Sequence, residues 1–182
     1  EPLAAALAIQ QQVTIRPDDK VLLLGDGKLG QLIAQTQALT GCELLVVGRH
    51  PQKLALLSGR GIATGTAEDV EAGAFDVAVE CTGNAEGFAL AQRSLRPRGT
   101  LVLKSTYAGK LALDASALVV DEIAVVGSRC GSFAPALRTL AAGRVEVEPL
   151  IQARFSLQDG LKAFAKASER NCLKVLLNIG EI

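Results

Sequence analysis

The sequence predicts an α/β fold in which a doubly wound, parallel sheet of six strands is followed by a C-terminal helix-strand extension. Short apolar segments alternate with helical segments over most of the chain, and this order is typical of a parallel sheet covered by helices on both faces. The chain has five Phe, one Tyr and no Trp, so its core has to be aliphatic, as in buried parallel sheets. A glycine-rich turn separates the first strand from the next helix.

The expected elements follow one another at short intervals. A leading helix covers residues 1–12, with Pro2 in its first turn and Leu3, Leu7 and Ala8 on one face. Strands are expected at 20–24, 43–47, 62–64, 75–80, 100–103 and 123–126. Helices are expected between the earlier strands at 29–39, 51–57 and 85–94.

The last part of the chain departs from this alternation. A helix is expected at 133–142, a second helix begins at a Ser156 cap and runs to about residue 168, and an apolar strand covers 172–179. No linker or second core is visible. We therefore expect one domain over 1–182, with a leading helix at 1–15, a sheet core at 16–145 and an extension at 146–182.

The composition is that of a globular protein, with 49% hydrophobic and 21% charged residues. The 19 basic and 19 acidic residues balance, and no basic run occurs, so neither nucleic acid nor an anionic membrane surface is expected as a partner. No apolar run reaches the roughly 20 residues of a membrane span. A mean hydropathy of +0.29 indicates apolar surface intended for a partner domain or subunit.

The cysteines point to a reducing compartment. Cys42, Cys81, Cys130 and Cys172 are too widely spaced for a zinc or redox motif, and each lies in or beside an apolar segment. We expect buried free thiols and a cytoplasmic protein.

The turn after the first strand carries the clearest functional signal. Gly25, Gly27 and Gly30 form a G-x-G-x-x-G motif around Lys28 and Leu29, directly after a strand and at the start of a helix. In the Rossmann dinucleotide-binding fold these glycines permit the tight turn, the approach of the pyrophosphate and close helix packing, and the helix N-terminus attracts the phosphates. A glycine turn without ligand and a methyl-donor site are the alternatives.

The end of the second strand bears on the choice of cofactor. Gly48 stands where an NAD-selective domain places an acid, and Arg49 and Lys53 could pair with a 2′-phosphate. This pattern favours NADP(H) over NAD(H), and the alternative is that both cations are ordinary solvated charges. His50, the only histidine, is expected near the adenine rather than in catalysis.

Several segments in order carry a family resemblance: 1–3 before a helix, the Gly25 loop, 80–83, 125–128 and 173–176. Together they resemble the medium-chain dehydrogenase/reductase family, and more closely its zinc-type alcohol and polyol dehydrogenases. The resemblance implies hydride transfer between a nicotinamide and an alcohol or carbonyl substrate. It also implies a separate catalytic domain that holds zinc, to which nothing here corresponds, so we expect the isolated chain to bind cofactor without catalysis.

The resemblance assigns further cofactor contacts by position. It places Cys81, Thr82, Gly83 and Asn84 near the cofactor ribose, Leu103, Lys104 and Ser105 near the nicotinamide, Ser128, Arg129 and Cys130 at the carboxamide, and Lys174 near the pyrophosphate. Glu1 matches a zinc-proximal glutamate, although one carboxylate cannot hold a metal. Alternatively, Cys81 and Cys130 are core thiols, and Lys104 and Arg129 are surface charges.

The sequence also bears on two alternative functions and on self-association. A short-chain reductase would need Tyr and Lys four residues apart, whereas Tyr107 and Lys110 are three apart. A non-catalytic dinucleotide-binding or redox-sensing module remains the alternative function. The apolar strand at 123–126 should end the sheet, and an exposed apolar edge favours a homodimer.

Overall fold

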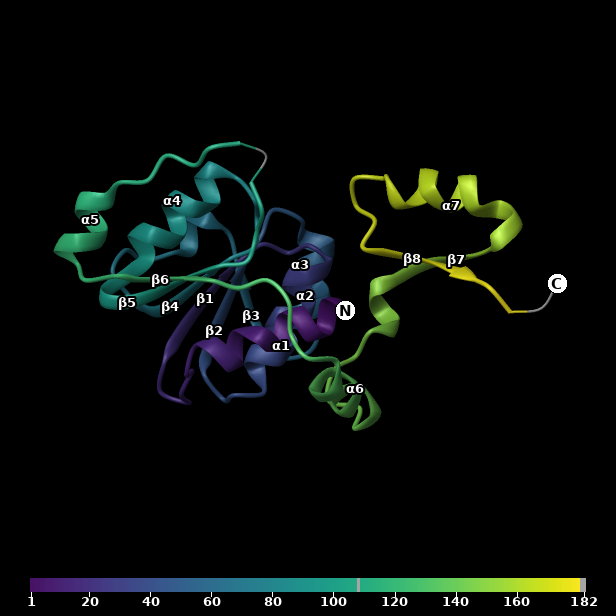
Figure 1. Cartoon of the computed structure of the whole chain (residues 1–182), viewed down its shortest axis with the longest axis horizontal. Helices are drawn as coiled ribbons and strands as arrows, with labels where there is room; N and C mark the ends of the chain where they lie inside the picture. Colours follow the sequence, from purple (N-terminus) through teal and green to yellow (C-terminus); the bar gives the residue numbers. More distant parts are fainter. Residues whose placement is uncertain (108, 181–182) are drawn as a thin grey trace.

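The computed structural model describes residues 1–107 and 109–180. Its main feature is a six-stranded parallel sheet in the order β3-β2-β1-β4-β5-β6 (Figure 1). The strands are β1 (Lys20–Leu24), β2 (Glu43–Val47), β3 (Ala63–Gly65), β4 (Phe75–Glu80), β5 (Leu95–Leu103) and β6 (Ala124–Gly127). The predicted fold class is therefore confirmed.

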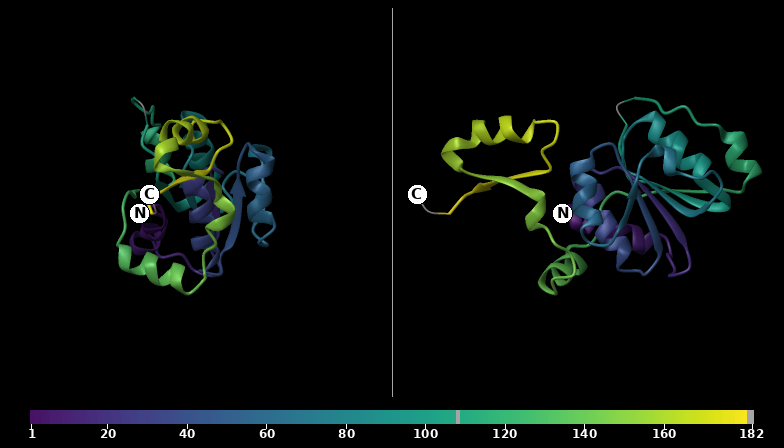
Figure 2. Two further views of the ribbon diagram at one scale, coloured as in Figure 1. Left: turned by 90° about the vertical axis from the view of Figure 1, so that its right-hand side faces the viewer. Right: turned by 180° about the vertical axis from the view of Figure 1, so that it is seen from behind.

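Helices cover both faces of this sheet (Figure 2). They are α1 (Pro2–Gln12), α2 (Lys28–Ala38), α3 (Pro51–Ser58), α4 (Ala85–Ser94), α5 (Ala115–Val120) and α6 (Phe133–Ala141), with short 3₁₀ turns η1 (Ala67–Asp69) and η2 (Glu148–Leu150). Successive side chains of β1 point to opposite faces, so Val21 and Leu23 join one core while Leu22 and Leu24 join the other. Two hydrophobic cores thus enclose the central strand, and the one that contains Leu22 and Leu24 also includes Phe75 and Phe88.

Helix α1 is buried along most of its length. Every residue from Leu3 to Ile9 is buried, because the helix packs between α2 and α6. A Cβ on Gly131 would lie 2.0 Å from the carbonyl oxygen of Ala4, so the loop after β6 runs directly against this helix. The leading helix is therefore tied to the carboxyl end of the sheet.

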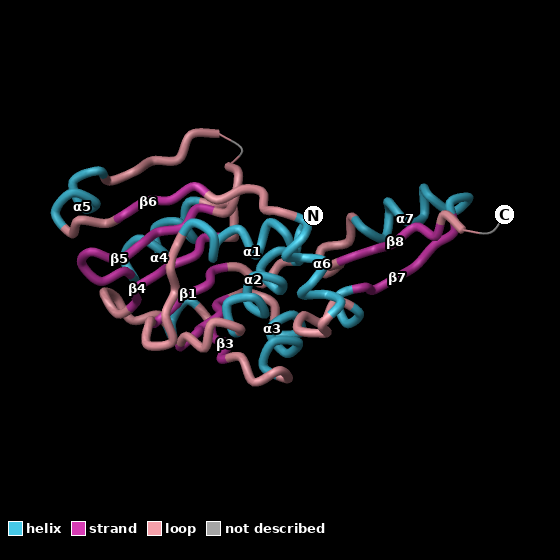
Figure 3. Tube along the Cα trace, turned by 60° about the horizontal axis from the view of Figure 1, so that its bottom comes forward, coloured by secondary structure: helices cyan, strands magenta, loops and turns pink. Residues whose placement is uncertain are grey.

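The C-terminal extension contains one strand more than the sequence predicts. It consists of β7 (Ile151–Ser156), the 3₁₀ turn η3 (Leu157–Asp159), α7 (Gly160–Ala167) and β8 (Lys174–Asn178), and β7 pairs with β8 in parallel. Ser156 caps the 3₁₀ turn through its hydroxyl, so the expected capping residue is correct. The small sheet lies to one side of the main sheet (Figure 3). The extension is thus a strand-helix-strand unit, not a helix-strand unit.

The edge strand and the cysteines complete the comparison with the expected fold. β6 is the last strand of the sheet, as predicted, and Val119 and Val120 just before it are 76% and 79% exposed. All four cysteines are free, but Cys130 is exposed and the other three are only partly buried, so the expectation of buried thiols is wrong. None of the described helices is both long enough and apolar enough to cross a membrane.

Candidate functional site

A cavity of about 700 Å³ opens at the carboxyl ends of β1, β2 and β4. The strand order reverses at this point, since β1 has β2 on one side and β4 on the other, and ligands of open α/β sheets bind at such a crevice. Many predicted residues line it: Gly25, Gly27, Gly48, Arg49, His50, Lys53, Cys81, Thr82 and Asn84. Asp26, Glu86 and Arg93 line it as well and were not predicted.

The glycine loop has the geometry that a pyrophosphate requires. Gly25 has a positive φ of 122° and lies so close to β4 that a Cβ would be 2.8 Å from the carbonyl oxygen of Cys81. A Cβ on Gly30 would be 2.0 Å from the carbonyl oxygen of Gly25, so α2 packs tightly on the loop. Gly27 caps α2, and a Cβ there would meet nothing within 4 Å. The helix N-terminus therefore faces open space that a phosphate group fits.

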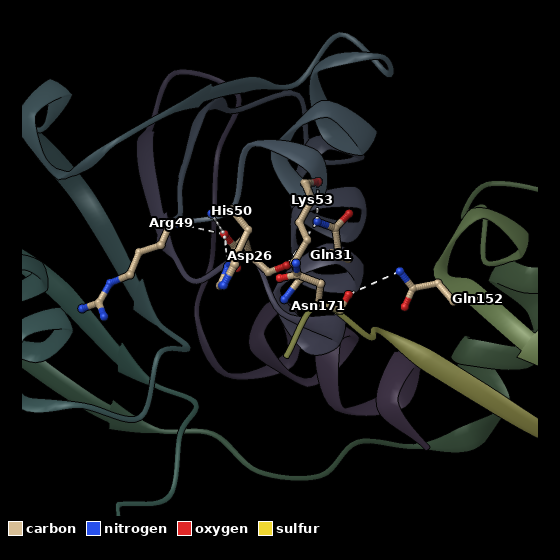
Figure 4. A network of polar contacts seen from close by, with 7 residues as sticks. All are labelled: Asp26, Gln31, Arg49, His50, Lys53, Gln152 and Asn171. Atoms are coloured by element: carbon tan, nitrogen blue, oxygen red, sulfur yellow. Dashed lines mark hydrogen bonds and ion pairs between the residues drawn. The ribbon is translucent and has the colours of Figure 1, made fainter. Parts of the chain in front are cut away.

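Asp26 occupies the space beside Gly48, and Figure 4 shows its side chain next to that of His50. Its Oδ2 accepts hydrogen bonds from the backbone N–H groups of Arg49 (2.8 Å) and His50 (2.7 Å), and its Oδ1 lies 2.9 Å from His50 Nδ1. A Cβ on Gly48 would lie 2.4 Å from Asp26 Oδ2. The expectation that no carboxylate stands at the end of β2 is therefore wrong, because the phosphate loop supplies one.

The two predicted cations of this region differ in environment. The Arg49 side chain is 70% exposed, points away from Lys53 in Figure 4 and forms an ion pair with Glu86 over 2.8 Å. Lys53 is buried, and its carbonyl oxygen accepts a hydrogen bond from Gln31 Nε2 over 2.9 Å. It also borders a second cavity of about 440 Å³ beside Gln152 of the extension. Lys53 is thus not an ordinary solvated charge.

The turn after β4 is organised by a buried carboxylate. Glu80 accepts hydrogen bonds from Thr82 N (2.5 Å), Gly83 N (2.9 Å) and the Tyr107 hydroxyl (2.5 Å). Asn84 caps α4 through its side-chain oxygen. Burial, with the nearby Glu80 charge, raises the pKa of Cys81 to about 12, and burial likewise raises the pKa of Tyr107. The hydrogen bonds to Glu80 and the Asn84 cap therefore fix the conformation of the turn after β4 beside the cavity.

The ends of β5 and β6 are joined by a buried lysine. Lys104 donates hydrogen bonds to Ser128 Oγ (3.0 Å) and to the carbonyl oxygen of Arg129 (2.9 Å), and burial lowers its pKa. It is not a surface charge, whereas Arg129 and Cys130 are exposed. These residues, with Leu103 and Ser105, lie at the carboxyl edge of the sheet but do not line the 700 Å³ cavity.

Two further predicted positions, Lys174 and Glu1, also lie outside the lining of this cavity. Lys174 is exposed at the start of β8, and Glu1 is exposed at the N-terminus of α1. Within residues 1–107 and 109–180, no group of at least three His, Cys, Asp or Glu side chains could hold a metal ion. The cavity at the ends of β1, β2 and β4 is therefore where the structure gathers most of the predicted residues of the glycine loop and of the β2 and β4 ends.

Residues 29–142, which are more than half of the chain, match the family model described as zinc-binding dehydrogenase. The chain belongs to the zinc-binding dehydrogenase family. The resemblance to zinc-type alcohol and polyol dehydrogenases is therefore confirmed.

Individual relatives agree with this assignment. The D-xylulose reductase of Morganella morganii is 25% identical over 184 residues, which cover 93% of this chain and 54% of that protein. L-Idonate 5-dehydrogenase from Escherichia coli K-12 superposes with a TM-score of 0.89 at 26% identity, covering 98% of this chain and 55% of that one. A Sinorhizobium meliloti 1021 protein solved with bound NADP has a TM-score of 0.86 at 24% identity, covering 97% of this chain and 57% of that one, and this likeness concerns the fold. The zinc-binding dehydrogenase chain spans about half the length of the relatives it matches.

The sequence did not predict that Asp26, Glu86 and Arg93 line the cavity, and the reasons differ. Asp26 stands inside the glycine motif, where its charge was a signal, but its contacts with the loop after β2 are tertiary. Glu86 and Arg93 lie on α4, and only the sheet order brings that helix to the end of β2. No local pattern marks either of them.

Proposed function

We propose that this chain is the dinucleotide-binding part of a zinc-type alcohol or polyol dehydrogenase. In the whole protein, a hydride would pass between the nicotinamide and an alcohol or carbonyl carbon. The observation that carries the proposal is the open space at Gly27, which lies at the N-terminus of α2 inside the cavity where the strand order reverses. The polyol dehydrogenases among the relatives support the same reaction class.

Separate parts of the sheet edge would hold separate parts of the cofactor. The loop from Gly25 to Gly30 would bind the pyrophosphate through backbone N–H groups, and the turn at 82–84 would contact a ribose. The loop at 128–130, fixed by Lys104, would hold the carboxamide. Zinc and the catalytic residues would belong to a further domain, since the described residues bring no metal ligands together. The chain by itself would then bind cofactor without turning over an alcohol.

We infer a preference for NADP(H) over NAD(H). Arg49, Lys53 and Arg93 give the cavity three cationic side chains, and Gly48 leaves the end of β2 without a side chain of its own. Arg49 is the principal candidate, because its exposed guanidinium can exchange Glu86 for a phosphate as bidentate partner. Asp26 and Glu86 oppose this preference, so the discrimination is moderate.

Two further properties belong to the same proposal. A homodimer through the β6 edge is supported by the exposure of Val119, Val120 and Val125. A cytoplasmic location is supported by the four free thiols.

A pair of dissociation constants for NADPH and NADH tests the cofactor proposal. One charge-assisted contact contributes about 1.5–3 kcal/mol, so Arg49→Ala should weaken NADPH by roughly 10- to 150-fold and leave NADH nearly unchanged. Salt concentration is kept fixed, because exposed charges are screened. Arg60→Ala, which removes an arginine outside this cavity, serves as the control. Equal weakening of both cofactors by Arg49→Ala would contradict the role of Arg49.

A further inference from the structure

We propose that Asp26 is a specificity-determining residue of the dinucleotide site. It is a built-in anion that takes the place of the side chain missing at Gly48 and limits the preference for a cofactor carrying a 2′-phosphate. This inference rests on the proposed function. The negative charge that would repel a 2′-phosphate then belongs to the loop from Gly25 to Gly30 and not to β2.

Several hydrogen-bond donors converge on the Asp26 carboxylate. Two consecutive backbone N–H groups, those of Arg49 and His50, donate to the same carboxylate oxygen at 2.8 Å and 2.7 Å. The His50 ring approaches the other oxygen at 2.9 Å (Figure 4). Successive backbone N–H groups of this kind form an anion-binding concavity. Here the concavity is already filled by a carboxylate of the chain itself.

Asp26 leaves no room for a side chain at position 48. The Cβ that any other residue would bring to position 48 lies 2.4 Å from Oδ2, 2.6 Å from Cβ and 2.7 Å from Cγ of Asp26. These distances are shorter than real Cβ contacts, so a larger residue at 48 requires Asp26 to move. The negative charge that an NAD-selective domain carries at the end of β2 is therefore supplied here by residue 26, and the absence of a side chain at Gly48 leaves room for it.

The charge of Asp26 lies inside the proposed cofactor cavity. Asp26 is 6% exposed and lines the same cavity as Arg49 and Lys53, so water screens its charge poorly. A 2′-phosphate brings roughly −1.5 to −2 charges, taking a phosphomonoester as its model, and is repelled by this carboxylate. A ribose hydroxyl is neutral and suffers no such repulsion. Asp26 should therefore weaken the binding of NADPH more than the binding of NADH, and so change the ratio of the two affinities.

The test is the ratio of dissociation constants for NADPH and NADH in the whole chain. Asp26→Asn keeps the shape and one acceptor oxygen but removes the charge, so the ratio should shift toward NADPH on the order of tenfold. Asp26→Ser removes the charge with a smaller side chain and should shift the ratio in the same direction. An unchanged ratio in both variants would overturn the inference.

A matched double variant keeps the carboxylate charge in the site but moves it from position 26 to position 48. Asp26→Gly combined with Gly48→Asp returns the carboxylate to the end of β2, and its ratio should stay close to that of the unaltered chain. If this double variant gains NADPH preference as Asp26→Asn does, charge is not the cause and the inference fails. If the unaltered chain binds neither cofactor, the proposed function fails. If the unaltered chain binds both cofactors but the Asp26 variants do not shift the ratio of dissociation constants as expected, the proposed function stands and this inference alone fails.

Discussion

The Lys104 ammonium donates a hydrogen bond to Ser128 Oγ over 3.0 Å and so joins the end of β5 to the end of β6. The same ammonium donates to the carbonyl oxygen of Arg129, and the loop that follows presses against α1 at Gly131. The Lys104 side chain therefore helps to hold the loop, together with the hydrogen bond from the Ser128 backbone N–H to the Leu103 carbonyl oxygen. Under the proposed function this loop meets the nicotinamide half of the cofactor.

Replacing Lys104 by Met should weaken only one half of the dinucleotide. Loss of the charge-assisted contacts should reduce NADPH affinity by roughly tenfold, since hydrogen bonds to charged groups contribute about 1.5–3 kcal/mol. ADP-ribose, which lacks the nicotinamide, should bind as before. Calorimetric titrations with both ligands measure the difference, and Lys110→Met, at an exposed lysine, is the matched control. Equal weakening of ADP-ribose would show that Lys104 supports the fold generally and not this loop.

The cysteines should differ sharply in reactivity. Burial and the charge of Glu80 raise the pKa of Cys81 to about 12, so almost none of it is thiolate near neutral pH. Cys130 is exposed after β6. Iodoacetamide should therefore modify Cys130 first, and Cys81 should react only as the pH rises toward 12 or after unfolding. Peptide mass spectrometry over time measures both sites. Early modification of Cys81 in the folded chain would contradict the described environment.

Two glycines of the phosphate loop should lose different amounts of stability when they are replaced by alanine. At Gly30 the new Cβ would lie 2.0 Å from the backbone oxygen of Gly25, so the helix must shift and the free energy of unfolding should fall by about 1–3 kcal/mol or more. At Gly27 the new Cβ meets no protein atom within 4 Å, and the cost should stay under about 1 kcal/mol. Urea denaturation compares the two variants. A larger loss for Gly27→Ala than for Gly30→Ala would show that the loop is packed differently.

A charge on the β6 edge should prevent self-association. Val125 is 43% exposed on this last strand, and Val125→Lys would place an ammonium where a second copy is expected to pair. Sedimentation velocity should show a dimer for the unaltered chain and a monomer for the variant. Lys110→Glu, away from the edge strand, should leave the dimer intact. A monomer at high concentration of the unaltered chain would refute the proposed homodimer.

Sequence reasoning succeeded where structure is locally encoded. The predicted bounds of β1, β2, β4 and α4 agree with the structure, because turn and capping residues such as Gly25, Gly48 and Asn84 lie next to them. It failed at β7, where Gln152 and Arg154 alternate with half-buried residues and the strand exists only through its pairing with β8. In the site, the glycine loop was predictable from spacing. The contact between Asp26 and the loop after β2 was not, because the parallel sheet alone brings residues 26 and 48 together.

The most direct test of the central claim is a calorimetric titration of the 182-residue chain with NADPH, followed by an alcohol-oxidation assay on the same sample. We expect one NADPH-binding site per chain and no oxidation of the alcohol. In Gly27→Ala the new Cβ would enter the space for the pyrophosphate, so the affinity for NADPH should fall by at least about tenfold. Absence of binding for both NADPH and NADH, or binding that Gly27→Ala leaves untouched, would contradict the central claim.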